Sequence, residues 1–282
     1  MLDILLARLK QGHRTVRFPD QPPALPDRFR GAPQLFPELC RDGCRACIDA
    51  CPTDALGKDD GGLRLDLGRC LFCADCTAAC PEGAIRYTTG HRLAARRRED
   101  LIVRADGLAR ARALDEKMLR LFRRSLKLRQ VSAGGCNGCE ADVNVLGTIV
   151  FDLGRFGIQY VASPRHADGL LITGPVTENM KLALQKTYDA VPPPKIVIAV
   201  GACAISGGPY IGHDEAHDGA DSVVPVDLYV AGCPPHPFTI LDGLLGLLDR
   251  LGPERLPPGS DDDHLRRRAD EAVKLLGADL QK

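Results

Sequence analysis

The second half of the chain alternates short apolar runs with amphipathic segments. Residues 126–132 alternate apolar and polar positions, which predicts a half-buried strand, and residues 140–157 follow with helical spacing. Further strands are expected over residues 158–163, 169–174, 195–203 and 224–233, and further helices over residues 177–191 and 236–251. This regular alternation predicts an α/β domain with an open parallel sheet.

Three other segments have helical patterns. Residues 2–9 are amphipathic and predict a short helix that packs on a partner protein or, as the alternative, on a membrane subunit or the bilayer surface. Residues 110–126 form a basic helical segment after the run of arginines at 96–98, and such runs more often face solvent or another subunit than lipid. Residues 259–280 predict a mostly polar helix with a serine cap.

Length and charge exclude several classes of protein. The chain has 282 residues, with 37 basic and 37 acidic side chains, so its formal net charge is zero. This length is enough for two domains, and the balanced charge gives no reason to expect nucleic acid as a partner. Residues 1–14 lack the pattern of a secretory signal, and no run of about twenty apolar residues is present. We therefore expect a cytoplasmic protein.

Cysteine usage points to metal chemistry. The sequence has twelve cysteines, and a cytoplasmic chain this rich in cysteine is more often a metal-binding protein than a disulfide-bonded one. Twelve divides into three sets of four, and four is the ligand number of an iron–sulfur cluster.

Eight of the cysteines form two runs that each end in proline. Cys70, Cys73, Cys76 and Cys80 have the spacing C-x2-C-x2-C-x3-C-P of bacterial ferredoxins. Cys40, Cys44, Cys47 and Cys51 repeat it with a first gap one residue longer, and Gly43 in that gap can absorb the insertion. Paired C-x2-C motifs also occur in zinc ribbons, but the repeated C-x3-C-P ending favours iron–sulfur clusters.

The ferredoxin pattern predicts crossed ligation, because the fourth cysteine of each run reaches the neighbouring cluster. We call the two resulting ligand sets cluster one and cluster two. Cluster one is expected to be bound by Cys40, Cys44, Cys47 and Cys80. Cluster two is expected to be bound by Cys51, Cys70, Cys73 and Cys76.

The remaining four cysteines each follow a predicted strand. Cys136 and Cys139 come after the strand at 126–132, Cys203 ends the strand at 195–203, and Cys233 ends the strand at 224–233. Loops after the carboxyl ends of parallel strands meet in one crevice, so these four cysteines are predicted to bind a third 4Fe–4S cluster, cluster three. The alternative is that Cys203 and Cys233 are buried structural cysteines, which pack well in a core.

Two resemblances to known families follow from these motifs. Residues 15–95, with the lead-in LPDRFRGAPQL, resemble two-cluster ferredoxins and the ferredoxin-like subunits of complex I and formate hydrogenlyase. Residues 117–250 resemble the small subunit of membrane-associated nickel–iron hydrogenases of the formate hydrogenlyase type and the 20 kDa subunit of complex I, through CNGCE, ITGPVTENM, GACAISGG and PVDLYVAGCPP. His236 and Ala231 depart from this pattern, which usually has arginine and proline there.

The resemblance implies a fold and a domain order. It implies an N-terminal ferredoxin-like α+β module followed by a flavodoxin-like domain with a parallel sheet. The expected domains are an N-terminal helix with the two-cluster ferredoxin (1–100), a basic helical linker (101–124), the flavodoxin-like 4Fe–4S domain (125–252) and a helical tail (253–282).

The same resemblance implies an electron-transfer subunit with three 4Fe–4S clusters. Its expected partners are a hydrogenase large subunit or a subunit like the complex I 49 kDa subunit, membrane subunits of the same complex, and a ferredoxin or formate dehydrogenase as electron donor. It would then lie on the inner face of the cell membrane through those partners. In one interpretation the chain delivers electrons to a partner with a nickel–iron site for proton and H2 chemistry. In the alternative the partner lacks nickel, and the electrons pass to quinone or are coupled to ion translocation. A free-standing carrier is the weakest class.

Several residues have two possible roles. Glu140 matches an acid that the hydrogenase resemblance links to proton transfer, but it also suits the start of a helix. His236 is either a proton carrier beside cluster three or a cap of the helix that follows. His213 and His217 have metal-like i,i+4 spacing, yet the surrounding Gly/Pro-rich segment predicts a solvated loop. The sequence has no phosphate-binding glycine loop, and no nickel-type pair of C-x2-C motifs follows residue 139, so no substrate-converting site is expected in this chain.

Overall fold

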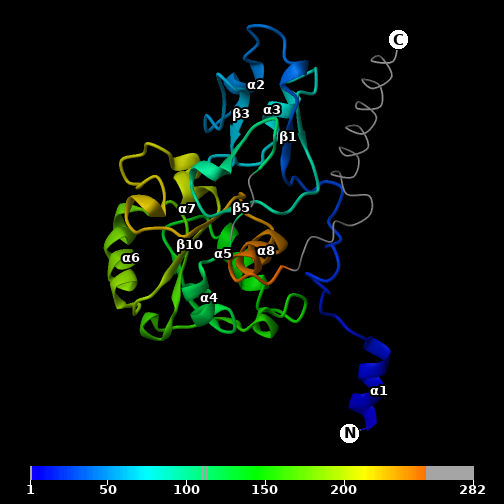
Figure 1. Ribbon diagram of the computed structural model, residues 1–282, viewed down its shortest axis with the longest axis vertical. Coiled ribbons are helices and arrows are strands. Elements are labelled where there is room, and N and C mark those ends of the chain that lie inside the picture. The colour runs from blue at the N-terminus through cyan, green and yellow to red at the C-terminus, as the bar shows by residue number, and fades with distance from the viewer. Residues whose placement is uncertain (1, 109–110, 112, 252–282) are drawn as a thin grey trace.

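The computed structural model describes residues 2–108, 111 and 113–251. Figure 1 shows two parts in contact: a smaller part from the first hundred residues, blue to cyan, and a larger α/β part, green to orange. The predicted tail helix at 259–280 lies outside the described residues. We describe the larger part first because it holds the last four cysteines.

The α/β part is built on a six-stranded sheet in the order β5-β11-β10-β9-β7-β8. The strands are β7 (Leu126–Ser132), β8 (Ile158–Tyr160), β9 (Gly169–Thr173), β10 (Ile196–Val200), β11 (Leu228–Val230) and β5 (Ala94–Ala95). The first five are parallel, and β5 is antiparallel to β11. In chain order the parallel strands run 2-1-3-4-5, which is the flavodoxin-like order. The predicted fold class is confirmed.

Helices cover both faces of this sheet, which explains why β9 and β10 are buried at every position. The helices are α4 (Glu116–Phe122), α5 (Gly138–Val145), α6 (Glu178–Ala190), α7 (Ala202–Ser206) and α8 (Pro237–Leu247). Leu184 of α6 belongs to the core on one face, and Ile240 and Leu244 of α8 belong to the core on the other. Figure 1 shows α6 and α8 on opposite sides of β10.

Two predicted helices are shorter than their patterns. The segment 140–157 is helical only to Val145, because Gly147 closes a turn onto the Asn144 carbonyl, and a 3-10 helix at Leu153–Phe156 follows. The basic segment 110–126 is helical over Glu116–Phe122, where the Asp115 side chain accepts hydrogen bonds from two backbone amides and sets the start. Thr177 occupies the N-cap of α6, but its side chain makes no capping bond.

The ferredoxin-like part contains two small sheets and two short helices. β1 (Pro33–Leu35) pairs with β4 (Ile85–Tyr87), and β2 (Leu56–Asp59), β3 (Gly62–Asp66) and β6 (Ile102–Val103) form the second sheet. The helices are α2 (Ala46–Asp49) and α3 (Asp75–Ala78), one in each cysteine run. This part also has 3-10 helices at Pro37–Leu39 and Glu99–Leu101. The α/β part has further 3-10 helices at Pro164–His166, Gly208–Tyr210 and Ala220–Ser222.

The two parts share one hydrophobic core. Leu63, Leu65 and Leu67 of the ferredoxin-like part belong to the same cluster of buried residues as Leu170 and Ile205 of the α/β part. The chain also crosses between the sheets, because β5 pairs with β11 while β6, a few residues later, returns to β3. The domain boundaries expected from the sequence stay a prediction.

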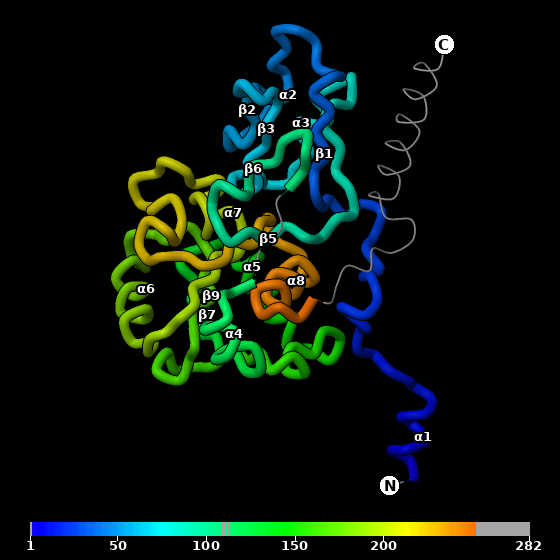
Figure 2. Tube along the Cα trace, in the orientation of Figure 1, coloured from blue at the N-terminus to red at the C-terminus, as the bar shows by residue number. Residues whose placement is uncertain are grey.

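The N-terminal helix α1 (Leu2–Gln11) has the predicted position and amphipathic pattern, and none of its residues is buried. Figure 2 shows it projecting away from both parts. Its docking partner stays a prediction. Among the described residues, none of the helices has the length and apolar character needed to cross a bilayer.

Candidate iron–sulfur sites

The structure brings the four predicted ligands of cluster one together. Burial raises the pKa of the Cys47 thiol, and the neighbouring sulfurs of Cys80, Cys40 and Cys44 raise it further. Gly43 has a φ of 71°, a left-handed conformation that accommodates the extra residue in the first gap. Cys80, from the second cysteine run, therefore lies beside the first run, as crossed ligation requires.

The predicted ligands of cluster two are also neighbours, and two of them, Cys70 and Cys76, are buried. Burial raises the pKa of Cys70 to about 11, with further contributions from Cys76 and Cys51. Burial also raises the pKa of Cys76, to which Cys73 and Cys51 contribute. Their mutual effect follows from electrostatics, because two nearby thiolates repel each other.

Backbone and tyrosine donors surround the sulfurs of cluster two. The Ala55 amide lies 3.2 Å from the Cys51 sulfur, and the Phe72 amide lies 3.3 Å from the Cys70 sulfur. The Tyr87 hydroxyl lies 3.4 Å from the Cys70 sulfur. Such donors stabilise thiolates and raise the reduction potential of a bound cluster. No sequence pattern marks Tyr87, which lies in β4, 17 residues from Cys70.

The four cysteines of cluster three meet at the carboxyl ends of three strands. Cys136 and Cys139 follow β7, Cys203 lies in α7 after β10, and Cys233 follows β11. Burial raises the pKa of Cys139, followed by the effects of Cys203, the Glu140 carboxylate, Cys233 and Cys136. Burial raises the pKa of Cys203 to about 12, and Cys233 and Cys136 raise it further.

A glycine at the end of β10 makes room for these sulfurs. Gly201 has a φ of 92°, and a Cβ at this position would overlap the Cys139 sulfur. Gly208 is similarly close, because its Cβ would lie 2.9 Å from the Cys203 sulfur. The backbone here therefore leaves room for two of the predicted cluster-three thiols, where any larger residue would collide with a sulfur.

The donor sets fit 4Fe–4S clusters. Within the described part of the chain, no three His, Cys, Asp or Glu side chains converge in the way that holds a single metal ion. In a 4Fe–4S cluster each thiolate binds a different iron atom, so its four ligands surround a volume and need not share one point. Thiols with raised pKa values must lose protons when they bind iron, so cluster binding and deprotonation are coupled.

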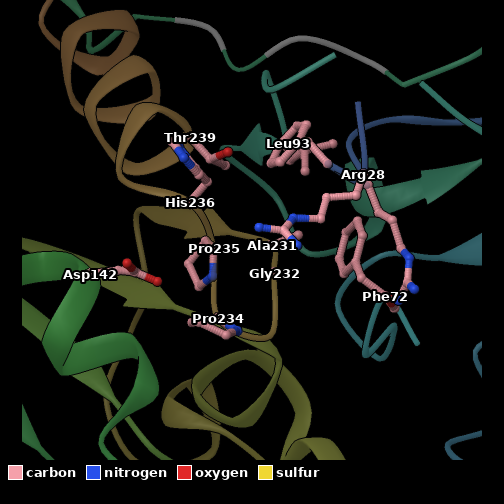
Figure 3. A pocket seen from close by; sticks show the side chains of 12 residues that line it. Arg28, Phe72, Leu93, Asp142, Ala231, Gly232, Pro234, Pro235, His236 and Thr239 are labelled. Atoms are coloured by element: carbon pink, nitrogen blue, oxygen red, sulfur yellow. Dashed lines mark hydrogen bonds between the residues drawn. The ribbon is translucent and has the colours of Figure 1, made fainter. Parts of the chain in front are cut away.

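The predicted ligands of cluster two and those of cluster three adjoin each other. Burial, Cys136 and Cys73 raise the pKa of Cys233, so a predicted ligand of cluster two is close enough to act on a predicted ligand of cluster three. A pocket of about 260 Å³ lies beside them. Phe72, next to Cys73, and Gly232 and Pro234, on either side of Cys233, line this pocket (Figure 3).

Glu140 is buried in α5, with 5% of its surface exposed. One carboxylate oxygen accepts hydrogen bonds from the Ser132 hydroxyl at 2.6 Å and the Thr173 hydroxyl at 2.7 Å. These two hydroxyls end β7 and β9, and sequence patterns alone did not indicate them. The location beside Cys139 suits the predicted proton-transfer role, which stays a prediction.

The three histidines of interest have structural contacts. The His236 ring caps α8 by accepting a hydrogen bond from the Phe238 amide at 3.2 Å. Burial and His91 lower the pKa of His236, which favours its neutral form. His213 lies in the predicted loop, where its ring accepts from the Glu215 amide, and His217 contacts Glu178.

This architecture, a dicluster ferredoxin fold joined to a flavodoxin-like domain with thiols at its strand ends, defines an iron–sulfur subunit of an oxidoreductase. Residues 39–84 match the 4Fe–4S dicluster domain, and residues 136–247 match the family described as NADH ubiquinone oxidoreductase, 20 kDa subunit. The chain belongs to this 20 kDa subunit family, and the predicted resemblance is confirmed.

Individual relatives are similar over 40% to 49% of this chain. Formate hydrogenlyase subunit 7 of Escherichia coli is 44% identical over 143 residues, which are 49% of this chain and 55% of that protein. A probable membrane-bound hydrogenase subunit of Pyrococcus furiosus is 40% identical over 48% of this chain and 81% of its own length. An NADH-quinone oxidoreductase subunit of Clostridium beijerinckii is 42% identical over 40% of this chain and 68% of its own length. The chain thus spans about half of the first relative and more of the other two.

Proposed function

We propose that this chain carries three 4Fe–4S clusters and relays electrons between a redox partner and the large catalytic subunit of a membrane-associated nickel–iron hydrogenase. The observation that carries the proposal is the proximity of Cys73 to Cys233, which joins the ferredoxin ligands to the ligands at the strand ends. The similarity to formate hydrogenlyase subunit 7 supports the hydrogenase branch. The separation of Cys136 from Cys139 by two residues supports it as well, because the complex I subunits that this chain resembles usually have adjacent cysteines there.

The protein's own residues hold and order the relay. The clusters supply one-electron carriers, and the twelve thiolates in the three sets fix their positions. Cys80 of the second cysteine run lies with the ligands of cluster one, and Cys51 of the first run lies with those of cluster two. Clusters one and two would therefore be held by interleaved segments of chain. Cys73 and Cys233 then bring the second and third sets together. The order along the relay is therefore cluster one, cluster two, cluster three.

The face around cluster three is the proposed contact with the large subunit. Cys136 and Cys233 are exposed, unlike the buried Cys203. A partner that covers this face would exclude water from the last step of the relay, and Glu140 would carry protons there. We place the complex on the inner face of the cell membrane, held by membrane subunits.

A second function has its own support. The NADH-quinone oxidoreductase subunit of Clostridium beijerinckii is as similar to this chain as the hydrogenase relatives are. In this alternative the large subunit lacks nickel, and electrons pass to quinone or drive ion translocation. The donor to cluster one would be a ferredoxin or formate dehydrogenase in either case.

The native complex distinguishes the two functions. We would purify the chain anaerobically with its partners, measure nickel, and follow the EPR signals of the clusters after exposure to H2. The hydrogenase proposal predicts about one nickel per chain and clusters that become reduced by H2 alone. A complex without nickel whose clusters ignore H2 but are oxidised by a quinone would overturn it in favour of the alternative.

A further inference from the structure

The pocket beside Cys73 and Cys233 is lined from both parts of the molecule. The loop at Phe72 forms one wall, and the loop from Ala231 to His236 forms another. Arg28 and Arg30, from the segment that precedes the first cysteine, complete it. Two guanidinium groups are therefore placed where the proposed relay crosses from cluster two to cluster three.

Arg30 is fixed to the loop of cluster two. Its guanidinium donates hydrogen bonds to the Phe72 carbonyl at 2.7 Å and to the Cys73 carbonyl at 3.0 Å. Phe72 has a φ of 54° and Ala74 has a φ of 72°, and such left-handed residues need support from their surroundings. Arg30 thus provides both a positive charge and a clamp on the loop that carries Cys73.

Arg28 provides charge without a clamp. Within the described part of the chain it has no hydrogen bond or ion pair. Figure 3 shows its side chain extending into the pocket toward Gly232 and Pro235, beside the loop of cluster three. An arginine kept in a pocket without a polar partner there acts through its field rather than through a fixed contact.

The other ionisable groups of the pocket do not cancel this charge. Asp142 is the carboxylate on its wall, and burial raises the pKa of Asp142, which weakens its tendency to ionise. His236 faces the pocket with its ring nitrogen Nδ1 occupied as an acceptor, so the ring is held neutral. Two cations against one half-buried carboxylate leave the pocket positive.

We propose that Arg28 and Arg30 raise the reduction potentials of clusters two and three, because their positive charge favours the reduced form of both clusters. This inference rests on the proposed three-cluster relay. Each step adds one electron to a cluster and removes one from its neighbour, so no other reactant is needed. The guanidinium groups lower the free energy of the added negative charge. They are positioning residues that raise the potentials of clusters two and three relative to cluster one and exchange no electron themselves.

The test is an EPR-monitored redox titration of the full chain with its clusters. Arg28→Gln and Arg28→Lys separate charge from size, and Arg30→Gln and Arg30→Lys do the same for the clamp. Arg120→Gln is the matched control, because Arg120 is an exposed arginine of α4, outside the pocket. We expect Arg28→Gln to lower the equilibrium constants for reduction of clusters two and three about tenfold, which is about 59 mV for a one-electron couple.

The lysine variants at Arg28 and Arg30 show whether the effect comes from the positive charge. Arg28→Lys should restore the potentials, and Arg30→Lys should restore them while the spectrum of cluster two broadens because the clamp is lost. Cluster one and the Arg120→Gln control should keep their potentials. Unchanged potentials in Arg28→Gln, or equal shifts in the lysine and glutamine variants, would overturn the inference and leave the relay intact. A wild-type chain without the cluster-three signal would instead overturn the proposed function together with this inference.

Discussion

An ion pair of the ferredoxin-like part lies beside its contact with the α/β part, and its removal has a calculable effect. The Arg98 guanidinium donates to both oxygens of Asp66, at 2.8 and 2.7 Å. The same carboxylate accepts from the Gly68 amide at 2.9 Å, and the Ser206 hydroxyl donates to the Gly68 carbonyl at 2.7 Å. Gly68 is two residues before Cys70 and Ser206 is three after Cys203, so the pair braces the loops of two clusters.

Asp66→Ala removes three hydrogen bonds and leaves Arg98 without its partner. Removing one member of a buried pair costs about 3–5 kcal/mol. The side chains are 26% exposed for Arg98 and 12% for Asp66, so solvent screens part of the loss and we take about 3 kcal/mol. Since about 1.4 kcal/mol is a factor of ten, local opening of the segment around this ion pair should become about a hundredfold more frequent.

Hydrogen exchange measures that opening. The Leu67 amide donates to the Leu101 carbonyl at 3.0 Å and does not bond to the mutated side chain, so it reports on opening of the segment around the ion pair. Its exchange in the anaerobic cluster-loaded protein should accelerate about a hundredfold in Asp66→Ala. Asp59→Ala, which removes the exposed pair with Arg104, is the control and should leave Leu67 unchanged. Equal exchange at Leu67 in wild type and Asp66→Ala would refute the reasoning.

Three further predictions follow from single side chains. Gly201→Ala should remove about four iron atoms per chain because its Cβ would overlap a cluster-three sulfur, while Gly212→Ala, also at positive φ but with open space around it, should keep them; equal iron contents would contradict this. Tyr87→Phe removes the donor to Cys70, so the reduction potential of cluster two should fall by the equivalent of about 1 kcal/mol. A redox titration should show the potential of cluster one unchanged. Burial raises the pKa of Asp227 in the folded protein, so ionisation costs stability as the pH rises above the ordinary aspartate value of about 4. The melting temperature of Asp227→Asn relative to wild type should therefore increase from about pH 4 to about pH 7, and a constant difference would argue against the burial effect.

Much of the fold could be predicted because its signals are local. Ferredoxin spacing of the first eight cysteines depends on short loops, and the strand–helix alternation depends on the period of apolar positions. The grouping of Cys203 and Cys233 could be predicted as well, because topology alone brings strand ends together. The predicted ligands of each cluster lie near one another, although the binding of three clusters stays a proposal.

The features that escaped prediction depend on distant pairs. Asp66 and Arg98 are 32 residues apart, and nothing in either neighbourhood marks them as partners. β5 consists of two residues and is a strand only because β11 offers an open edge. The pattern at 140–157 predicted too long a helix, because the period of apolar positions does not reveal the turn that Gly147 closes.

The iron content of this chain tests the central claim most directly. We would purify the full chain anaerobically and measure iron per chain in the wild type and in Cys203→Ser, with EPR of the reduced protein to identify the clusters. The three-cluster relay predicts about twelve iron atoms in the wild type and about eight in the variant, with the two ferredoxin signals retained. About eight iron atoms in both proteins would contradict it, because the cysteines at the strand ends would then hold no cluster.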